Sequence, residues 1–394
     1  MSNEQIVEEA EDVLEEISSW DELDVPTDLL RGVYAMGFEK PSPIQSKAVA
    51  PIISGRDVLA QAQSGTGKTA TFTIGALARV TLTDNFTQVL VLTPTRELCS
   101  QITSVFKGIG VMLEGLRVKT VVGGNSIDED IRELKNEPPH VIVGCSGRVQ
   151  DMMNRGYISY KTIKLLIIDE ADEMLSIGFK DQVYEIFQYL NTDIQVALFS
   201  ATLPEYIRVM TGKFMRNPVR IYVKSEQLTL EGISQYFVAV EDDRQKYATL
   251  KELYGFMSLS QCIIYCNSVK RVVELYEAML EDGFPVCCMH SSMDKRAREE
   301  AFSEFRCGKY RVLISSNVTS RGIDIQQVST VINFDIPKSI ENYLHRIGRS
   351  GRWGRKGVGI NFITRRDVSK LKEIETHYSC QINELPANFE TLAR

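Results

Sequence analysis

The hydrophobic residues of this chain gather in short apolar runs, and longer segments of mixed polarity separate the runs. Runs rich in Val, Ile and Leu indicate strands that are buried on both faces, and the segments between them have the length of helices. This alternation predicts a parallel sheet with helices on both faces. In the first half of the chain the predicted strands are Val58–Ala60, Val89–Leu92, Thr120–Val122, Val141–Val143, Leu165–Ile168 and Val196–Phe199.

A second series of the same kind follows residues 224–232, a polar segment that breaks the pattern and that we interpret as a linker. We therefore expect two α/β domains in tandem, at residues 20–223 and 233–394, behind an acidic tail at residues 1–19. The predicted strands of the second domain are Cys262–Tyr265, Val286–Met289, Val312–Ser315, Val331–Phe334 and Gly359–Ile363.

Charge and composition refine this picture. The 394 residues are 43% hydrophobic and 25% charged, which is typical of soluble globular proteins, and neither a membrane-spanning run nor a signal peptide is visible. The net charge of −7 argues against nucleic acid as a partner, but residues 1–24 hold ten acidic side chains and no basic one. The rest of the chain is slightly basic, so the tail does not describe the binding surface. Residues 4–17 form either a short amphipathic helix or a solvated tail.

Cysteine usage indicates a reducing compartment. The eight cysteines include no C-x-x-C pair, and several lie in apolar, strand-like runs. Buried thiols therefore fit better than disulfides or a zinc site.

The first candidate site is the end of the predicted strand Leu165–Ile168, which runs directly into Asp169, Glu170 and Asp172. Buried carboxylates are costly unless they are paired or bind a cation, and an acidic pair at a strand end suits Mg²⁺. The glutamate beside a metal-binding aspartate could orient an attacking water. A strand that runs into an acidic helix cap is the alternative.

The second candidate site follows the predicted strand Val58–Ala60. Residues 62–69 match the phosphate-binding pattern G-x-x-x-x-G-K-[ST], with Ala62 in the place of the first glycine. Lys68 would reach the β and γ phosphates, and Thr69 could bind Mg²⁺. A strand before the motif, a helix after it and the acidic strand end downstream together predict a nucleoside-triphosphate site.

Other polar clusters follow predicted strands, at the edge where ligands bind in open α/β sheets. These clusters are Pro94–Glu97, Gly123–Gly124, Ser146–Arg148 and Ser200–Thr202.

Upstream of the phosphate-binding motif, Gln45 could pair with the edge of an adenine, and Trp20 or Phe38 could pack against the base. The chemistry alone suggests that Gln45 is an ordinary loop glutamine. Residues 345–356 are basic, with arginines at a spacing of three that would share a helix face. They form either a solvated turn or an arginine finger.

Together these motifs resemble the DEAD-box RNA helicases, in the family's order: a glutamine motif ending at Gln45, AQSGTGKT, PTREL, a glycine pair, DEAD, SAT and HRIGRSGR. Within the family the chain is similar to eukaryotic initiation factor four-A and its relative in the exon junction complex. The segments at 214–221, 228–233 and 354–362 carry that match.

The resemblance implies two RecA-like domains, ATP and Mg²⁺ as cofactors, and an ATP-dependent RNA helicase that serves translation initiation. It further implies a monomer that binds RNA and proteins of the initiation complex, without a membrane, in the cytoplasm or the nucleus. Two alternatives stay open: an RNA clamp whose nucleotide is trapped by partner proteins, and a motor that acts on DNA.

The resemblance also implies residue roles. Lys68, Asp169, Glu170, Arg349 and Arg352 would carry catalysis, with Thr69 and Asp169 binding Mg²⁺. Ser200 and Thr202 would connect nucleotide state with domain closure. The nucleotide would be held by Lys40, Gln45, Ser64, Gly65, Thr66, Gly67, Lys68, Thr69, Asp324, Arg349 and Arg352. RNA would contact Pro94, Thr95, Arg96, Gly123, Gly124, Arg148, Asn267 and Arg298, mainly through its backbone.

Several residues depart from the family pattern, and most lie on or near the segments expected to face RNA. The residues matched to ATP handling are intact, so the departures put the strength of RNA binding in question. A loop without proline at position 146 should be looser, and Asn317 lacks the charge of an aspartate. The departures are Trp20 for Phe, Cys99 for Ala, Cys145-Ser146 for Thr-Pro, Lys295 for Gln, Ser316-Asn317 for Thr-Asp and Ser320 for Ala.

Overall fold

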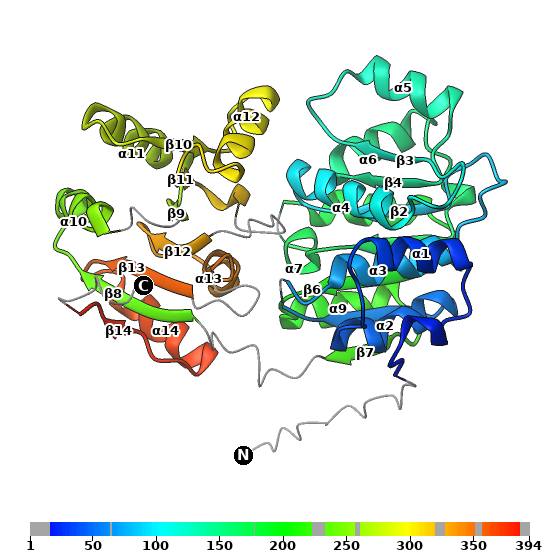
Figure 1. The fold of residues 1–394 in the computed structure, drawn as a ribbon, viewed down its shortest axis with the longest axis horizontal. Coiled ribbons are helices and arrows are strands. Elements are labelled where there is room, and N and C mark those ends of the chain that lie inside the picture. The colour runs from blue at the N-terminus through cyan, green and yellow to red at the C-terminus, as the bar shows by residue number, and fades with distance from the viewer. Residues whose placement is uncertain are drawn as a thin grey trace. The chain divides into compact units, whose positions relative to one another are not determined.

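The computed structural model contains two sheets, each built of seven parallel strands (Figure 1). The described residues fall into two compact units, one within residues 1–223 and one within residues 224–394. The predicted linker at 224–232 and nearly all of the predicted helix at 4–17 lie outside the described residues. The structure describes residues 16–63, 65–176, 178–222, 233–256, 261–319, 328–350 and 357–386.

The sheet of the first unit has the strand order β3-β4-β2-β5-β6-β1-β7. Every pairing in it is parallel. The apolar runs are continuous because both faces are covered. The strands are β1 (Val58–Gln61), β2 (Val89–Leu92), β3 (Val118–Val121), β4 (Val141–Gly144), β5 (Leu165–Ile168), β6 (Gln195–Ser200) and β7 (Val219–Tyr222).

Helices cover both faces of this sheet, and alternate strand residues serve the two layers, as the pleat requires. Val89 and Val91 belong to the core under α1 to α4, whereas Leu90 and Leu92 belong to the core under α5 to α9. The helices are α1 (Thr27–Ala35), α2 (Pro43–Ile53), α3 (Lys68–Ala78), α4 (Arg96–Ile109), α5 (Ile127–Asn136), α6 (Ser146–Asn154), α7 (Ala171–Met174), α8 (Lys180–Tyr189) and α9 (Glu205–Phe214).

The second unit repeats this architecture with the strand order β10-β11-β9-β12-β13-β8-β14. Apolar residues of α12 to α14 pack on one face and those of α10 and α11 on the other. Its strands are β8 (Ile233–Ala239), β9 (Gln261–Tyr265), β10 (Val286–Met289), β11 (Val312–Ser315), β12 (Val328–Asn333), β13 (Gly357–Ile363) and β14 (Asn383–Glu384). Its helices are α10 (Asp243–Phe256), α11 (Val269–Glu281), α12 (Lys295–Arg306), α13 (Ile340–Ile347) and α14 (Val368–Tyr378).

These sheets confirm the predicted fold class of two parallel sheets flanked by helices. All eleven predicted strands are present, with ends shifted by up to a few residues. Three strands at or near the sheet edges, β7, β8 and β14, were not predicted. Strand β7 alternates in burial and β8 has a single buried residue among seven, so neither is a continuous run of buried apolar residues. Among the described residues, no helix combines the length and the apolar character needed to cross a membrane.

Candidate functional site

Three neighbouring strands of the first sheet bring the phosphate-binding motif and the acidic turn to one edge. Strand β6 pairs with β5 on one side and with β1 on the other. The segment after β1 contains the phosphate-binding motif, and Asp169 follows β5 directly. Because all three strands are parallel, their C-terminal ends lie at the same edge, where ligands of open α/β sheets bind.

The segment that joins β1 to α3 has the backbone of a phosphate-binding loop. Gly65 and Gly67 have φ values of 87° and 101°, in the left-handed region that favours glycine. Lys68 is buried as the first residue of α3, and its ammonium group donates a hydrogen bond of 2.6 Å to the carbonyl of Ala62. The lysine therefore spans the loop at the helix N-terminus, where an anion is favoured. Ser64 lies outside the described residues.

Gln45 anchors this loop. Its side-chain oxygen accepts a hydrogen bond from the backbone N–H of Ser42 at 2.7 Å, and its amide nitrogen lies 3.4 Å from the carbonyl of Gly67. The hydroxyl of Ser42 donates to the carbonyl of Thr66 at 2.7 Å. A Cβ atom at Gly67 would lie only 2.7 Å from the Gln45 amide nitrogen and would displace it from this contact.

One expectation about this region is wrong, and another is narrowed to one of its two residues. Gln45 is in the first turn of helix α2 rather than in a loop, because Pro43 takes the first helical position, where proline is favoured. Trp20 is fully buried in the core, and its indole donates to the carbonyl of Phe38 at 3.0 Å. Its ring is therefore not free to pack against a base. Lys40 is exposed.

The acidic turn after β5 is buried and strained. Asp169 and Glu170 are 3% and 2% exposed, and Glu170 has a φ of 52°, which is unusual for a residue with a side chain. Burial and the charge of Glu170 raise the pKa of Asp169 to about 7, and the Lys68 ammonium opposes this shift. A cation beside these carboxylates would relieve their mutual repulsion.

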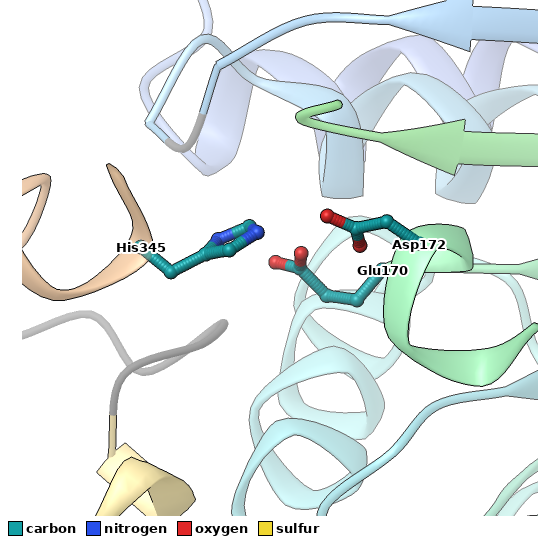
Figure 2. A group of neighbouring side chains, drawn as sticks. All are labelled: Glu170, Asp172 and His345. Carbon is teal, nitrogen blue, oxygen red and sulfur yellow. The ribbon is translucent and has the colours of Figure 1, made fainter. Parts of the chain in front are cut away.

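Asp172 connects this turn with the end of β6. Thr202 donates a hydrogen bond of 2.7 Å to the Asp172 carboxylate, and the Asp172 backbone N–H lies 3.3 Å from the Ser200 hydroxyl. Figure 2 shows the carboxyl groups of Glu170 and Asp172 side by side after β5, at the start of α7. A movement of the Asp172 carboxylate would therefore be transmitted to the segment after β6 through its hydrogen bond with Thr202.

The residues at this edge fit a nucleoside triphosphate with Mg²⁺. Positive φ angles at two glycines shape a cradle for phosphate groups, and the adjoining lysine supplies a positive charge. The hydroxyl of Thr69 follows Lys68 in the first turn of α3. The buried Asp169 carboxylate is a hard oxygen ligand of the type that Mg²⁺ prefers.

The predicted RNA residues of the first unit surround the start of α4. Thr95 caps this helix, with its hydroxyl accepting from the backbone of Leu98 at 3.3 Å. The guanidinium of Arg96 lies against the glycine pair, since a Cβ atom at Gly124 would be 2.6 Å from it. Gly124 has a φ of 89°, so the backbone favours glycine there, and a Cβ atom would also push the Arg96 guanidinium aside. Pro94 is buried at the end of β2, and Gly123 is half-buried.

Arg148 lies close by on α6 and is already engaged. It donates to the buried carboxylate of Asp130 at 2.6 Å and to the carbonyl of Asn125 at 3.1 Å. Lys119 also contacts Asp130, at 3.4 Å. The Ser146 hydroxyl donates to the side-chain oxygen of Gln182 at 2.6 Å. A hydrogen bond therefore holds Ser146 at the position where proline is expected from the family pattern.

In the second unit, the side chain of Arg346 joins two segments matched to the family, one after β9 at Asn267 and one after β11 at Asn317. Its buried guanidinium donates to the side-chain oxygens of Asn267 and Asn317, each at 2.8 Å. It also donates to Asn333 at 3.2 Å and to the backbone carbonyl of Asp335 at 2.8 Å. All four acceptors are neutral, and burial lowers the pKa of Arg346 to about 10.

Of the remaining predicted residues of this unit, Arg298 and Arg349 are described. Helix α13 ends at Ile347, so the expectation that the arginines at a spacing of three share one helix face is wrong. Arg349 lies beyond the helix end and is buried, and its guanidinium donates back to the carbonyl of His345 at 3.1 Å. Arg298 is buried on α12. Asp324, Arg352 and Ser320 lie outside the described residues.

Sequence reasoning missed three residues that hold these sites together: Ser42, Asp130 and Arg346. The first had a visible signal, because Ser42 and Gln45 form the S-x-x-Q pattern of a capping box. Asp130 resembles any acid in the first turn of a helix, and Arg346 is one arginine in a basic run. Their roles appear only when the strands and helices are brought together.

Comparisons with known proteins agree with this geometry. The model of the DEAD/DEAH box helicase family matches residues 42–209, and the helicase conserved C-terminal domain matches residues 245–354. Eukaryotic initiation factor 4A of Caenorhabditis elegans is 49% identical, over 95% of this chain and 93% of that protein. ATP-dependent RNA helicase FAL1 of Mycosarcoma maydis is 51% identical over 95% and 94% of the two chains. Eukaryotic initiation factor 4A-III homolog A of Oryza sativa subsp. japonica is 50% identical over 100% and 96%.

A solved structure of a relative has the same fold. Dbp5 of S. cerevisiae bound to RNA and ADP BeF3 superposes with a TM-score of 0.89 at 34% identity, covering 96% of this chain and 99% of that chain. The order of motifs, the two sheets and the full-length similarity to curated relatives agree. The chain therefore belongs to the DEAD-box family of ATP-dependent RNA helicases.

Proposed function

We propose that this helicase binds ATP at the C-terminal edge of the first sheet and uses its hydrolysis to unwind RNA structure during translation initiation. One observation carries the nucleotide assignment: the glycine cradle and Lys68 share a sheet edge with the buried carboxylates of Asp169 and Glu170. The similarity to initiation factor 4A over nearly the whole chain supports the cellular role.

At this site we assign Lys68 to the β and γ phosphates, and Thr69 and Asp169 to Mg²⁺. When bound, Mg²⁺ would neutralise charge on the phosphate oxygens. The carboxylate of Glu170 positions the attacking water and accepts its proton. Because Glu170 is buried beside Asp169, its charge is held in a medium where electrostatic effects are strong.

The remaining nucleotide contacts complete this assignment. Gln45 would hold the adenine while it anchors the loop at Gly67, and Lys40 assists at the surface. The second domain would supply groups for the ribose and the γ-phosphate, and arginines in such positions stabilise charge in the transition state. The residues assigned to the second domain are Asp324, Arg349 and Arg352.

RNA binding involves a separate group of residues in both domains. The backbone and 2′-hydroxyls are the expected contacts, so sequence preference should be low and affinity should fall as salt rises. Arg96 and Arg148 supply positive charge in the first domain, and Asn267 and Arg298 supply contacts in the second. The glycines at 123 and 124 let the RNA backbone approach closely. Pro94 and Thr95 complete the set.

We further propose that the protein acts as a monomer inside the cell, with initiation-complex proteins as partners. The relatives' names as initiation factors support this setting. A cytoplasmic location fits translation, and a nuclear one would fit the relatives named as 4A-III homologs.

Two assays on the full chain test the proposal. ATPase rate is measured with and without single-stranded RNA, and strand separation is measured on a short RNA duplex with ATP. We expect RNA to stimulate hydrolysis and the duplex to be unwound. Stable RNA retention without unwinding, seen only with a partner and trapped nucleotide, would identify a clamp instead. Equal stimulation by single-stranded DNA would contradict RNA selectivity.

A further inference from the structure

Two thiols meet beside the proposed RNA contacts of the first unit. The sulfur atoms of Cys99 and Cys145 lie 3.7 Å apart, although the residues are 46 positions apart in sequence. Cys99 is on the buried face of α4, and Cys145 is half-buried at the N-cap of α6. Both positions are among the departures from the family pattern.

The pair connects the two elements that carry Arg96 and Arg148. Cys99 is one turn after Arg96 on α4, and Cys145 precedes Arg148 by three residues. Helix α4 packs on β4, the strand that ends immediately before Cys145. A bond between these sulfurs would therefore fix the start of α6 to the first turn of α4.

The two thiols have different environments. Burial raises the pKa of Cys99 well above its usual value, so this sulfur stays a protonated thiol. Cys145 is more accessible and stands at the N-cap of α6. Because Cys145 is the more accessible thiol, an oxidant reaches its sulfur first. The buried thiol of Cys99 then attacks the oxidised sulfur.

We propose that Cys99 and Cys145 form an oxidisable dithiol that closes to a disulfide with a peroxide as the oxidant. The sulfur of Cys145 attacks a peroxide oxygen and gives up its thiol proton, the oxygen–oxygen bond breaks, and the departing oxygen takes up a proton, which leaves a sulfenic acid and, from hydrogen peroxide, water. The sulfur of Cys99 then attacks the sulfenic sulfur, the sulfur–oxygen bond breaks, and a second water leaves with the thiol proton. Two thiols are oxidised by two electrons and one peroxide is reduced.

The disulfide should weaken RNA binding, a consequence that rests on the proposed RNA role of Arg96 and Arg148. A bond of about 2.05 Å requires the sulfurs to approach from their present separation, which draws α6 towards α4. Arg148 is held by Asp130 and Asn125 only three residues from the cross-link, so a shift at the start of α6 would displace its guanidinium from the proposed phosphate contact. The nucleotide loop after β1 contains neither cysteine.

The test treats the full-length protein with hydrogen peroxide and maps disulfides by peptide mass spectrometry under non-reducing conditions. The affinity for labelled single-stranded RNA is then measured with a non-hydrolysable ATP analogue, before and after reduction by dithiothreitol. We expect a Cys99–Cys145 linked peptide and RNA affinity lower by roughly five- to tenfold, the scale of losing about one hydrogen bond. Reduction should restore affinity.

Matched variants separate this disulfide from other oxidation. Cys99→Ala and Cys145→Ser should each keep their RNA affinity after peroxide, whereas Cys307→Ser, which removes an exposed thiol, should behave as wild type. Absence of the linked peptide in wild type, or a linked peptide with unchanged RNA affinity, would overturn the inference. Reduced protein that fails to bind RNA would instead contradict the proposed RNA contacts.

Discussion

Replacing Asn317 with aspartate should stabilise the second unit through Arg346. The Asn317 side-chain oxygen accepts a hydrogen bond of 2.8 Å from the Arg346 Nε, and the guanidinium is fully buried among neutral acceptors. Charge-assisted hydrogen bonds are worth roughly twice neutral ones, a gain of about 1 kcal/mol. Residue 317 is exposed, so desolvating the new carboxylate costs little, while water limits the Coulomb energy.

The matched variant Asn317→Ala should have the opposite effect, because the Arg346 Nε loses this acceptor, at a cost of about 1–3 kcal/mol. Both variants are compared with wild type by urea unfolding at 25 °C. Pulsed hydrogen exchange of β12 and α13 peptides assigns the transition to the second unit. Destabilisation by Asn317→Asp, or no effect of Asn317→Ala, would refute the role given to this hydrogen bond.

Two further predictions concern the first unit. Burial and the charge of Arg117 lower the pKa of His140, whose ring accepts from the Arg117 backbone N–H at 3.1 Å. The unfolded state binds the proton more tightly, so the contribution of His140 to stability is lost as pH falls below about 6.5. His140→Asn should therefore be less stable than wild type at pH 7.5 and lose less stability by pH 5.5 in urea unfolding. Ser146→Ala removes the donor to Gln182 and should lower the free energy of unfolding by about 1 kcal/mol, and an unchanged urea midpoint would count against that bond.

Much of the fold was visible in the sequence because parallel strands buried on both faces leave continuous apolar runs. Leu165–Ile168 and Val89–Leu92 were predicted with their observed ends. Strands β8 and β14 were missed because only one residue of β8 is buried and β14 has only two residues. Edge strands are defined by their pairing, which a local pattern does not contain.

The candidate site was predictable where a motif has a fixed backbone requirement. Gly67 and Lys68 are such residues, because the loop needs a left-handed glycine followed by a helix N-terminus. The contacts that support the site were not predictable, since they join distant segments. Arg346 resembled its basic neighbours in sequence, yet its guanidinium is buried and donates hydrogen bonds to three asparagines from separate segments of the chain.

The central claim is that ATP is hydrolysed at the edge where Glu170 follows β5. The direct test is RNA-stimulated ATPase activity of Glu170→Gln, measured beside ATP and RNA affinity. The variant keeps the shape of the side chain and removes its negative charge, so both ligands should bind as in wild type. Turnover should fall by about 10²–10⁴, the contribution of a positioned general base. Near wild-type turnover with intact binding would contradict the account.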